Sequence, residues 1–331
     1  MENVFDTTII GGGPAGLFAA FYAGMRDLST NMIDSLPQLG GQLAELYPEK
    51  YIYDIAGHPK IKAGDLVQNL LAQIEPFHPT VHLNETVQDL IRLDDGTFKI
   101  ITDRKAHFSR TIIVTAGIGA FTPRRLPVAE EEKFSGRGIY YQLTNVDMCK
   151  GKDVIVVGGG DSAVDFALMI EPVAKSVTLV HRRDQFKAHE ESVKQMRDST
   201  VNIKTFFELQ RVQGDDVVTG VILKDNRDKH TEELAADLIF SALGFTAALG
   251  SIVNWGLEIE NNQIVVNTRM ETSVPGVYAA GDIVTYPGKL KLITCGFGEA
   301  PIAVNNAKTY IHPNAKLYPG HSSDRKQPEP K

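Results

Sequence analysis

The hydrophobic pattern begins with a short strand-like run at residues 5–10, apolar at Phe5, Ile9 and Ile10, which predicts a β-strand. The glycine-rich loop 11–16 comes next, and nearly every residue of 17–23 is apolar, as in a helix that packs on a sheet. A second short run at 31–33, with the apolar Met32 and Ile33, predicts the next strand, which ends at the acidic Asp34. Strand, glycine-rich loop, helix, strand and acid is the order found in dinucleotide-binding units. This stretch therefore predicts one such unit.

Within the loop, Gly11 permits the tight turn, Gly13 lets the backbone approach a pyrophosphate, and Gly16 lets helix and strand pack closely. The pyrophosphate is expected at the helix N-terminus. Asp34 is placed to accept hydrogen bonds from an adenosine ribose with a free 2′-hydroxyl, and it would repel a 2′-phosphate. A glycine pattern alone also occurs in ordinary turns, but the complete context favours a dinucleotide site.

The same pattern occurs a second time. Residues 153–157 predict the entering strand, the loop 158–163 opens a helix over 164–170, and residues 176–180 predict the next strand. Ala163 replaces the third glycine, a change that the motif accepts. The repeat predicts an α/β fold with two dinucleotide-binding (Rossmann-like) domains.

The second repeat differs from the first in the residues that come after its last strand. His181, Arg182 and Arg183 stand where a site for NAD would have an acid. A guanidinium fork can make paired, charge-assisted bonds to a 2′-phosphate, which favours NADP(H). The alternative is a solvated basic turn that Asp184 neutralises. The residues predicted to hold NADP(H) are Gly158, Gly160, Asp161, Ser162, Ala163, His181, Arg182 and Arg183.

Each repeat is followed by a stretch with the period of β-strands, at 80–115 and again at 202–236. Apolar strands after residue 244 resemble those of the first domain, so the second domain is expected to be inserted into the first. The predicted division is 1–120 for the first part of the first domain, 121–244 for the inserted domain, and 245–331 for the remainder.

Composition excludes several classes of protein. A chain of 331 residues that is 43% hydrophobic and 23% charged is typical of a globular protein with room for two domains. Its net charge of −7 argues against general nucleic-acid binding. The chain has no apolar run long enough for a membrane span, and the acidic Glu2 and Asp6 do not fit a signal peptide, so we expect a cytoplasmic protein. No metal site is predicted.

Residues 38–42, with their paired glycines and amides, and the nearby Tyr47 have the chemistry of a wall for a flavin ring. A surface loop with a half-buried tyrosine is the alternative. Together with Ala280-Gly281-Asp282, both glycine loops and the basic turn, the chain resembles the two-dinucleotide-domain flavoproteins that include low-molecular-weight thioredoxin reductase. This resemblance implies FAD in the first domain, with Asp282 bonded to its ribityl chain. From the residues alone, Asp282 is equally a helix N-cap or a turn residue.

The thioredoxin reductases of this family carry a Cys-x-x-Cys a little before the second glycine loop, and here residues 140–147 contain no cysteine. Cys149 and Cys295 are too far apart for such a pair, and two cysteines are too few for a disulfide framework. A relay through a dithiol is therefore excluded. Cys149 is interpreted as a small packed residue.

The chain is similar instead to the thioredoxin-reductase-like class of ferredoxin–NADP(+) reductases, which lack the dithiol and have a C-terminal extension. The similarity is specific at residues 38–43 with 47–48, at 281–289 with 296–300, and in the tail 318–323. It implies that Tyr47 stacks on one face of the flavin and His321 covers the other. The implied FAD contacts are Gly11, Gly13, Pro14, Ala15, Gly16, Asp34, Gly41, Gln42, Tyr47, Val87 (through its backbone), Phe121, Asp282 and Ser323. Without the resemblance, His321 would be a residue of a frayed terminus.

The resemblance implies that NADPH gives a hydride to flavin N5 and that electrons then pass singly to ferredoxin or flavodoxin, with no acid or base residue required. A homodimer is implied as well. Because ferredoxin is acidic, Arg124, Arg125, Lys289 and Lys291 are candidates for a basic docking patch, although each could be an ordinary solvated cation. The alternatives are a disulfide reductase that uses a partner's thiols, an NADPH diaphorase or oxidase, and a non-catalytic flavin redox sensor.

Overall fold

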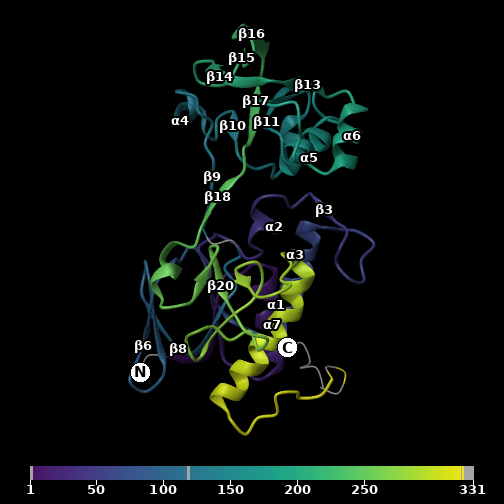
Figure 1. Ribbon diagram of the computed structural model, residues 1–331. Coiled ribbons are helices and arrows are strands. Elements are labelled where there is room, and N and C mark those ends of the chain that lie inside the picture. Colours follow the sequence, from purple (N-terminus) through teal and green to yellow (C-terminus); the bar gives the residue numbers. More distant parts are fainter. Residues whose placement is uncertain (1–2, 118–119, 322, 324–331) are drawn as a thin grey trace. The chain divides into compact units, whose positions relative to one another are not determined.

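The computed structural model describes residues 3–117, 120–321 and 323, without the side chains of 120–123 and 245–248 (Figure 1). The chain forms two compact units: Met1–Ala120 with Ala247–Lys331, and Phe121–Thr246. The backbone returns to the first unit two residues later than the junction expected after residue 244. The segments at the two junctions, β9 (Ala120–Pro123) and β18 (Phe245–Ala248), pair with each other.

The first unit is built on a mixed sheet. Its strands follow the order β5 (Thr80–His82), β2 (Thr30–Ile33), β1 (Val4–Ile10), β8 (Ala106–Val114), β7 (Phe98–Thr102) and β6 (Val87–Arg92), and β21 (Val277–Ala279) also pairs with β8. The pairs among β5, β2, β1, β8 and β21 are parallel, whereas β6, β7 and β8 are antiparallel. The predicted α/β fold is confirmed, and the strand-forming stretch after the first repeat supplies the antiparallel strands.

Helices α1 (Pro14–Met25) and α7 (Ile293–Ile311) lie side by side in the first unit (Figure 1). The rings of Phe18 and Phe297 are 5.1 Å apart, and further along the same pair Arg26 bonds Asn305. The two helices are thus parallel, with both N-termini at the same end.

The remaining elements of the first unit are α2 (Gln42–Glu45), α3 (Ala63–Ile74), β3 (Tyr51–Ile52), β4 (Ile61–Lys62), β19 (Ile259–Glu260), β20 (Gln263–Val265), β22 (Val284–Thr285) and the 3-10 turns η1 (Glu75–Phe77) and η3 (Gly250–Asn254).

A buried polar cluster fastens the antiparallel strands to the parallel ones. Glu85 is 3% exposed, and its carboxylate accepts a hydrogen bond from Thr102 Oγ1 at 2.6 Å and lies 2.6 Å from His107 Nε2. Burial would raise the pKa of Glu85, but the bonds from Thr102 and His107 bring it below its usual value. A buried carboxylate is tolerated only when it is paired in this way. The cluster therefore connects β7 and β8 to the loop that follows β5.

The second unit has an all-parallel five-stranded sheet. Its order is β10 (Ile139–Tyr140), β17 (Leu238–Ala242), β11 (Asp153–Gly158), β12 (Ser176–His181) and β13 (Asn202–Thr205). An antiparallel sheet of β14 (Phe207–Gln213), β15 (Gly220–Asp225) and β16 (Thr231–Ala235) follows. The helices are α4 (Glu131–Phe134), α5 (Asp161–Ile170), α6 (Glu190–Arg197) and the 3-10 turn η2 (Val146–Cys149). Both units thus share the plan that the repeated pattern predicts.

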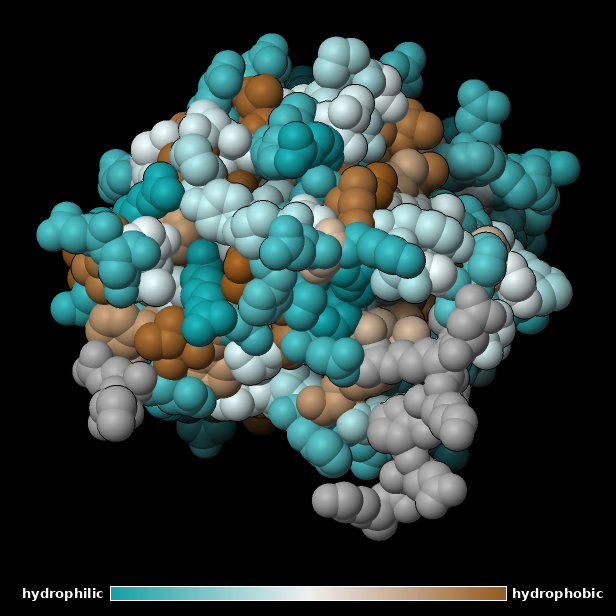
Figure 2. Space-filling model, turned by 90° about the horizontal axis from the view of Figure 1, so that it is seen from below, coloured by the Kyte–Doolittle hydropathy of each residue, from teal (hydrophilic) through white to brown (hydrophobic). Residues whose placement is uncertain are grey.

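On the face drawn in Figure 2, hydrophobic residues stand in small groups between hydrophilic ones. Among the described residues, no helix is long and apolar enough to cross a bilayer.

Candidate dinucleotide-binding sites

The first glycine loop connects β1 to α1 across the end of β8. Gly11 has a φ of +104°, and a Cβ there would lie 2.6 Å from the carbonyl oxygen of Thr115. A Cβ on Gly16 would lie only 2.0 Å from the carbonyl oxygen of Gly11. The Thr115 hydroxyl donates to that same oxygen at 2.7 Å. The loop therefore needs glycine at both positions for backbone and helix to come this close.

The N-termini of α1 and α5 have the features of anion sites. Gly13 is the N-cap of α1 and Gly160 that of α5, and no side chain caps either helix. A Cβ on Gly13 or Gly160 would meet no protein atom within 4 Å. The open backbone and the positive end of the helix dipole fit the pyrophosphate of a dinucleotide in each unit. Pro14, Ala15 and, in the second unit, Asp161 to Ala163 line the first turns.

Asp34 lies directly after β2, where the sequence predicts a ribose-binding acid. It is 8% exposed, and its carboxylate accepts hydrogen bonds from the amides of Gly12 at 2.5 Å and Leu36 at 2.8 Å. Burial raises its pKa, and the two amides partly oppose that effect. Asp34 therefore bonds the backbone of the first glycine loop, at the position where the ribose of a dinucleotide would be bound.

The loop 38–43 packs directly on the first glycine loop. The amide of Gly40 donates to the carbonyl oxygen of Gly12 at 2.8 Å, and a Cβ on Gly41 would lie 2.9 Å from Gly13 Cα. The side-chain nitrogen of Gln42 lies 3.7 Å from where a Cβ on Gly117 would be. Gly41 and Gln42 thus lie beside the open end of α1.

Tyr47 and Asp282 come together although they are far apart in sequence. Both are half-buried; burial raises the pKa of each, and the Asp282 carboxylate raises that of Tyr47 further. A Cβ on Gly281 would lie 3.1 Å from Ala15 Cβ, and one on Gly296 would lie 3.3 Å from it. The Gly281-Asp282 turn and the first turns of α1 and α7 therefore meet at one point. Asp282 is a turn residue before β22. The alternative that it is a helix N-cap is wrong, because the N-cap of the next helix, α7, is Leu292.

Glu299, in α7, was not found from the sequence. Its carboxylate accepts hydrogen bonds from the Gly281 amide at 2.7 Å, from the Tyr286 hydroxyl at 2.7 Å and from Lys289 Nζ at 2.5 Å. The Lys289 side chain is only 5% exposed, so the prediction that it belongs to a docking patch is wrong: burial and the ion pair commit it to Glu299. The sequence signal was an acid among the small residues of 296–303, on the face that α7 buries.

In the second unit, His181 packs beneath the glycine loop. Its ring stacks on Phe186 at 5.2 Å and fills the space that a Cβ on Gly159 would need, 2.2 Å from its nearest atom. Arg182 and Arg183 are exposed. The structure thus separates a supporting histidine from two exposed cations.

Backbone bonds attach the turn after β12 to the glycine loop. The amide of Lys187 donates to the carbonyl oxygen of Gly159 at 2.7 Å, and the Asp161 carboxylate accepts from the His189 amide at 2.9 Å. Lys187 is a further exposed cation of this turn, which sequence reasoning did not single out. The basic turn is therefore held next to the N-terminus of α5.

For the other predicted FAD residues, Val87, Phe121, His321 and Ser323, the structure gives fewer contacts, and their roles stay predictions. The Val87 carbonyl oxygen accepts a hydrogen bond from Ser251 Oγ at 2.7 Å. Phe121 is in β9, and its side chain is outside the described residues. His321 and Ser323 are exposed, and the His321 ring is 5.7 Å from that of Tyr318. The described contact of His321 is thus with Tyr318 in the same tail, and its expected place over the flavin stays a prediction.

Cys149 is fully buried, and burial raises the pKa of its thiol to about 11, with Lys152 opposing. A thiol that stays protonated is a poor nucleophile. Cys295 belongs to α7 in the other unit, so neither cysteine has a second thiol beside it in the sequence or in its own unit. This fits the interpretation of Cys149 as a packed residue.

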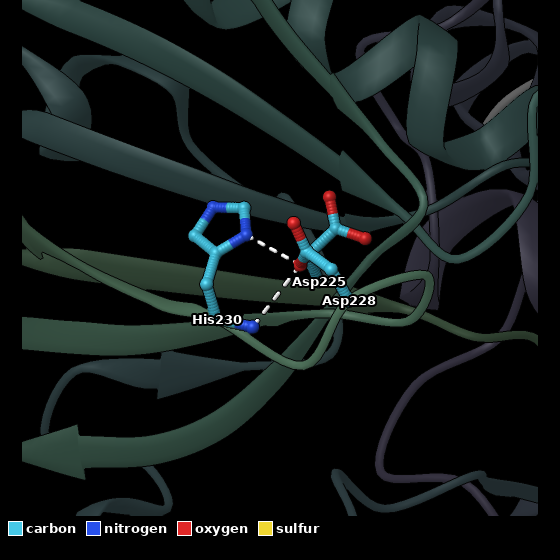
Figure 3. A group of neighbouring side chains, drawn as sticks. All are labelled: Asp225, Asp228 and His230. Carbon is cyan, nitrogen blue, oxygen red and sulfur yellow. Dashed lines mark hydrogen bonds and ion pairs between the residues drawn. The ribbon is translucent and has the colours of Figure 1, made fainter.

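Asp225, Asp228 and His230 bring their ligand atoms within 4.8 Å of one another at the turn between β15 and β16 (Figure 3). Their groups already have partners: Arg227 binds the Asp225 carboxylate through two nitrogens, and His230 Nδ1 lies 2.6 Å from Asp228 Oδ1. The cluster closes a turn, and no metal site is assigned to it.

Known proteins resemble this chain along nearly its whole length. Residues 5–307 match the pyridine nucleotide-disulphide oxidoreductase family. Proteins named ferredoxin–NADP reductase from Geobacillus kaustophilus and Halalkalibacterium halodurans are each 55% identical over 323 residues, which cover 97% of this chain and 97% and 98% of theirs.

Among solved structures, the thioredoxin reductases of T. acidophilum and Lactococcus lactis superpose with TM-scores of 0.78 and 0.77. Each is 26% identical, covering 93% of this chain and 99% of the other. These relatives confirm the resemblance on which the sequence interpretation depends. The chain belongs to the pyridine nucleotide-disulphide oxidoreductase family and, within it, to the thioredoxin-reductase-like group that includes these ferredoxin–NADP reductases.

Proposed function

We propose that the protein is an FAD-dependent reductase that passes electrons between NADPH and a one-electron carrier, ferredoxin or flavodoxin. The observation that carries this proposal is the pair of uncapped helix N-termini, one beside Asp34 and the other beside two exposed arginines. Relatives named ferredoxin–NADP reductase support it. The absence of a neighbouring thiol pair disfavours a disulfide-reductase mechanism.

FAD fits the first unit, where its pyrophosphate would lie over Gly13 to Gly16, its ribose at Asp34 and its ring near Tyr47. Gln42 and the Gly281-Asp282 turn would contact the same molecule. NADPH would lie over Gly160 to Ala163, with Arg182 and Arg183 at its 2′-phosphate. When bound, FAD supplies the chemistry that accepts two electrons together and releases them singly. The protein binds, orients and shields it.

The proposal is tested by comparing electron acceptors. The purified holoenzyme with NADPH should reduce ferredoxin or flavodoxin at a higher kcat/KM than oxygen or dithionitrobenzoate. A preference for oxygen would indicate a diaphorase or oxidase, and a preference for the disulfide reagent would indicate a disulfide-reductase relative. Absence of turnover with every acceptor would favour the redox sensor. Each of these three results would overturn the proposal.

An acidic carrier would be attracted by exposed cations, and the remaining candidates are Arg124 and Arg125 in the second unit and Lys291 in the first. All three are exposed, and Arg125 also pairs with Glu131 at 3.0 Å. Attraction between exposed charges is screened by salt. Carrier reduction in the acceptor assay should therefore slow as ionic strength rises, while reduction of a neutral quinone should not.

We also propose a cytoplasmic homodimer in which His321 covers the flavin of the second copy. The start of the tail is held by Arg26, which is 7% exposed and donates to the carbonyl oxygens of Lys316 at 2.7 Å and Leu317 at 3.2 Å. The same guanidinium bonds Asn305 at 2.7 Å. The anchor thus lies far along α7 from its N-terminus, where the Gly281-Asp282 turn would contact the flavin.

The reach of the tail supports a site shared by two chains. From Ile293 to Asn305, α7 rises about 18 Å. From Leu317 to His321 an extended chain spans at most about 14 Å. With Leu317 held at the level of Asn305, the Cα of His321 stays at least about 4 Å short of the first turn of its own α7, so only the imidazole could reach a ring there. This short reach favours a second copy of the chain as the source of the histidine that covers the flavin.

Mixing two variants tests this arrangement. Chains with Tyr47→Ala and chains with His321→Ala are each expected to hold a half-covered flavin with altered fluorescence. If the tail crosses between copies, a mixed dimer regains one site with both residues, so part of the native flavin signal returns. A monomeric mass in sedimentation, or a mixture that shows only the average of the two variants, would contradict the proposal.

A further inference from the structure

The buried ion pair between Lys289 and Glu299 is unused by the function proposed above. Both side chains are at most 5% exposed. Long charged side chains are rarely buried, because removing each charge from water is costly even when it is paired. Hydrophobic residues of similar volume would often stabilise a fold as well. A buried ion pair at this position therefore points to a role other than stabilising the fold.

We propose that Glu299 and Lys289 are a positioning pair for the flavin, which hold the Gly281-Asp282 turn against α7 and balance the charge beneath the ring. The proposal rests on the assignment of FAD to the first unit. Neither residue touches the reacting atoms in this proposal, and each acts through the turn and through its charge.

The positional part follows from the bonds that Glu299 makes. One carboxylate oxygen accepts from the Gly281 amide, so the residue directly before Asp282 is fixed to α7. The other oxygen accepts from Tyr286 and Lys289, which lie on the segment that leads from the turn into α7. A single buried carboxylate thereby connects the turn, the connecting segment and the helix. Asp282 and the α7 N-terminus keep one relative position.

The electrostatic part follows from the pair being neutral. Glu299 and Lys289 cancel each other's field, and the partial positive charge of the α7 N-terminus is left to act on the ring. If one partner loses its charge, the other is left uncompensated in a poorly solvated place, where charges act over longer distances than in water. Charge on the protein side shifts the balance between oxidised and reduced flavin, because the reduced form is more negative.

The experiment measures the midpoint potential of the bound flavin, by dye equilibration without any carrier protein, in Glu299→Gln and Lys289→Met. Glu299→Gln leaves a positive charge and should raise the potential, whereas Lys289→Met leaves a negative charge and should lower it. For a charge about 10 Å from the ring, each shift corresponds to roughly a tenfold change in the ratio of reduced to oxidised flavin. The double variant should return toward the wild-type potential.

Lys291→Met is the matched control, because it removes an exposed lysine of the same segment, whose charge solvent screens. It should shift the potential much less than Lys289→Met does. Equal shifts in the two lysine variants, shifts of the same sign in Glu299→Gln and Lys289→Met, or no shift in either would overturn the inference. If a single variant does not fold, the double variant is measured instead. A wild-type midpoint potential together with a lower affinity for FAD supports the inference. A potential and an affinity that both equal those of the wild type overturn it.

These outcomes differ from a failure of the proposed function. A wild-type chain that binds no flavin would overturn the FAD assignment itself. A wild-type chain that binds FAD, with variants that leave its potential and its affinity unchanged, would overturn only the role of Glu299 and Lys289.

Discussion

Replacing both Arg182 and Arg183 with alanine is expected to raise the KM for NADPH by about a hundredfold, and the KM for NADH by less than about threefold. Hydrogen bonds to a charged partner contribute about 1.5–3 kcal/mol each, and two of them are lost only when the 2′-phosphate is present. Both residues are exposed, and the turn that carries them is attached to the loop before α5, so they are available to a nucleotide bound there. Steady-state kinetics with each nucleotide, at fixed acceptor concentration, measures the two constants.

Arg197→Ala is the control, because it removes an exposed arginine of the same unit at the far end of α6. It should leave both constants within about twofold of wild type, since exposed charges distant from a ligand contribute little. If the double variant changed the two nucleotides equally, the arginines would not read the 2′-phosphate, and the solvated-turn alternative would be preferred.

Gly16→Ala is expected to produce a protein that retains little or no FAD. The added methyl would lie 2.0 Å from the Gly11 carbonyl oxygen and 2.8 Å from the Thr115 hydroxyl. Because the Gly11 carbonyl oxygen belongs to the backbone and cannot rotate away, the helix and the loop must move apart. Overpacking of this kind costs about 3 kcal/mol, which lowers cofactor affinity by roughly a hundredfold if the cost falls on the bound state. The ratio of flavin to protein absorbance after gel filtration measures the loss.

Ala163→Gly provides the converse control in the second loop, where the corresponding position already carries a methyl. The second loop accommodates the Ala163 methyl, whereas a Cβ on Gly16 would lie 2.0 Å from the Gly11 carbonyl oxygen, so the two loops are packed differently at this point. Removing the Ala163 methyl should leave flavin content unchanged and alter the KM for NADPH by less than about threefold. A Gly16→Ala protein that kept a full complement of FAD would show that the loop opens without penalty.

The sequence by itself determined the features that depend on neighbours along the chain. The two glycine loops and their flanking strands could be recognised because a tight turn, a close backbone approach and an apolar helix leave a local pattern. The difference between Asp34 and the pair Arg182 and Arg183 could be read in the same way, because each lies after a strand of its own unit. The missing thiol pair was equally plain. The roles of Tyr47, Asp282 and His321 came from the family resemblance, because the local sequence pattern allowed other interpretations of each residue.

Only the tertiary structure decided which polar groups are buried and what they bind. Lys289 looked like a surface cation, yet folding places it against Glu299, a partner on another element. His181 stood in line with two arginines, but its ring packs beneath Gly159. Arg26 gave no signal at all, because its acceptors near residues 305 and 316–317 lie at the other end of the chain. Desolvation and hydrogen bonding are set by atoms that meet in space, so no pattern along the chain could reveal them.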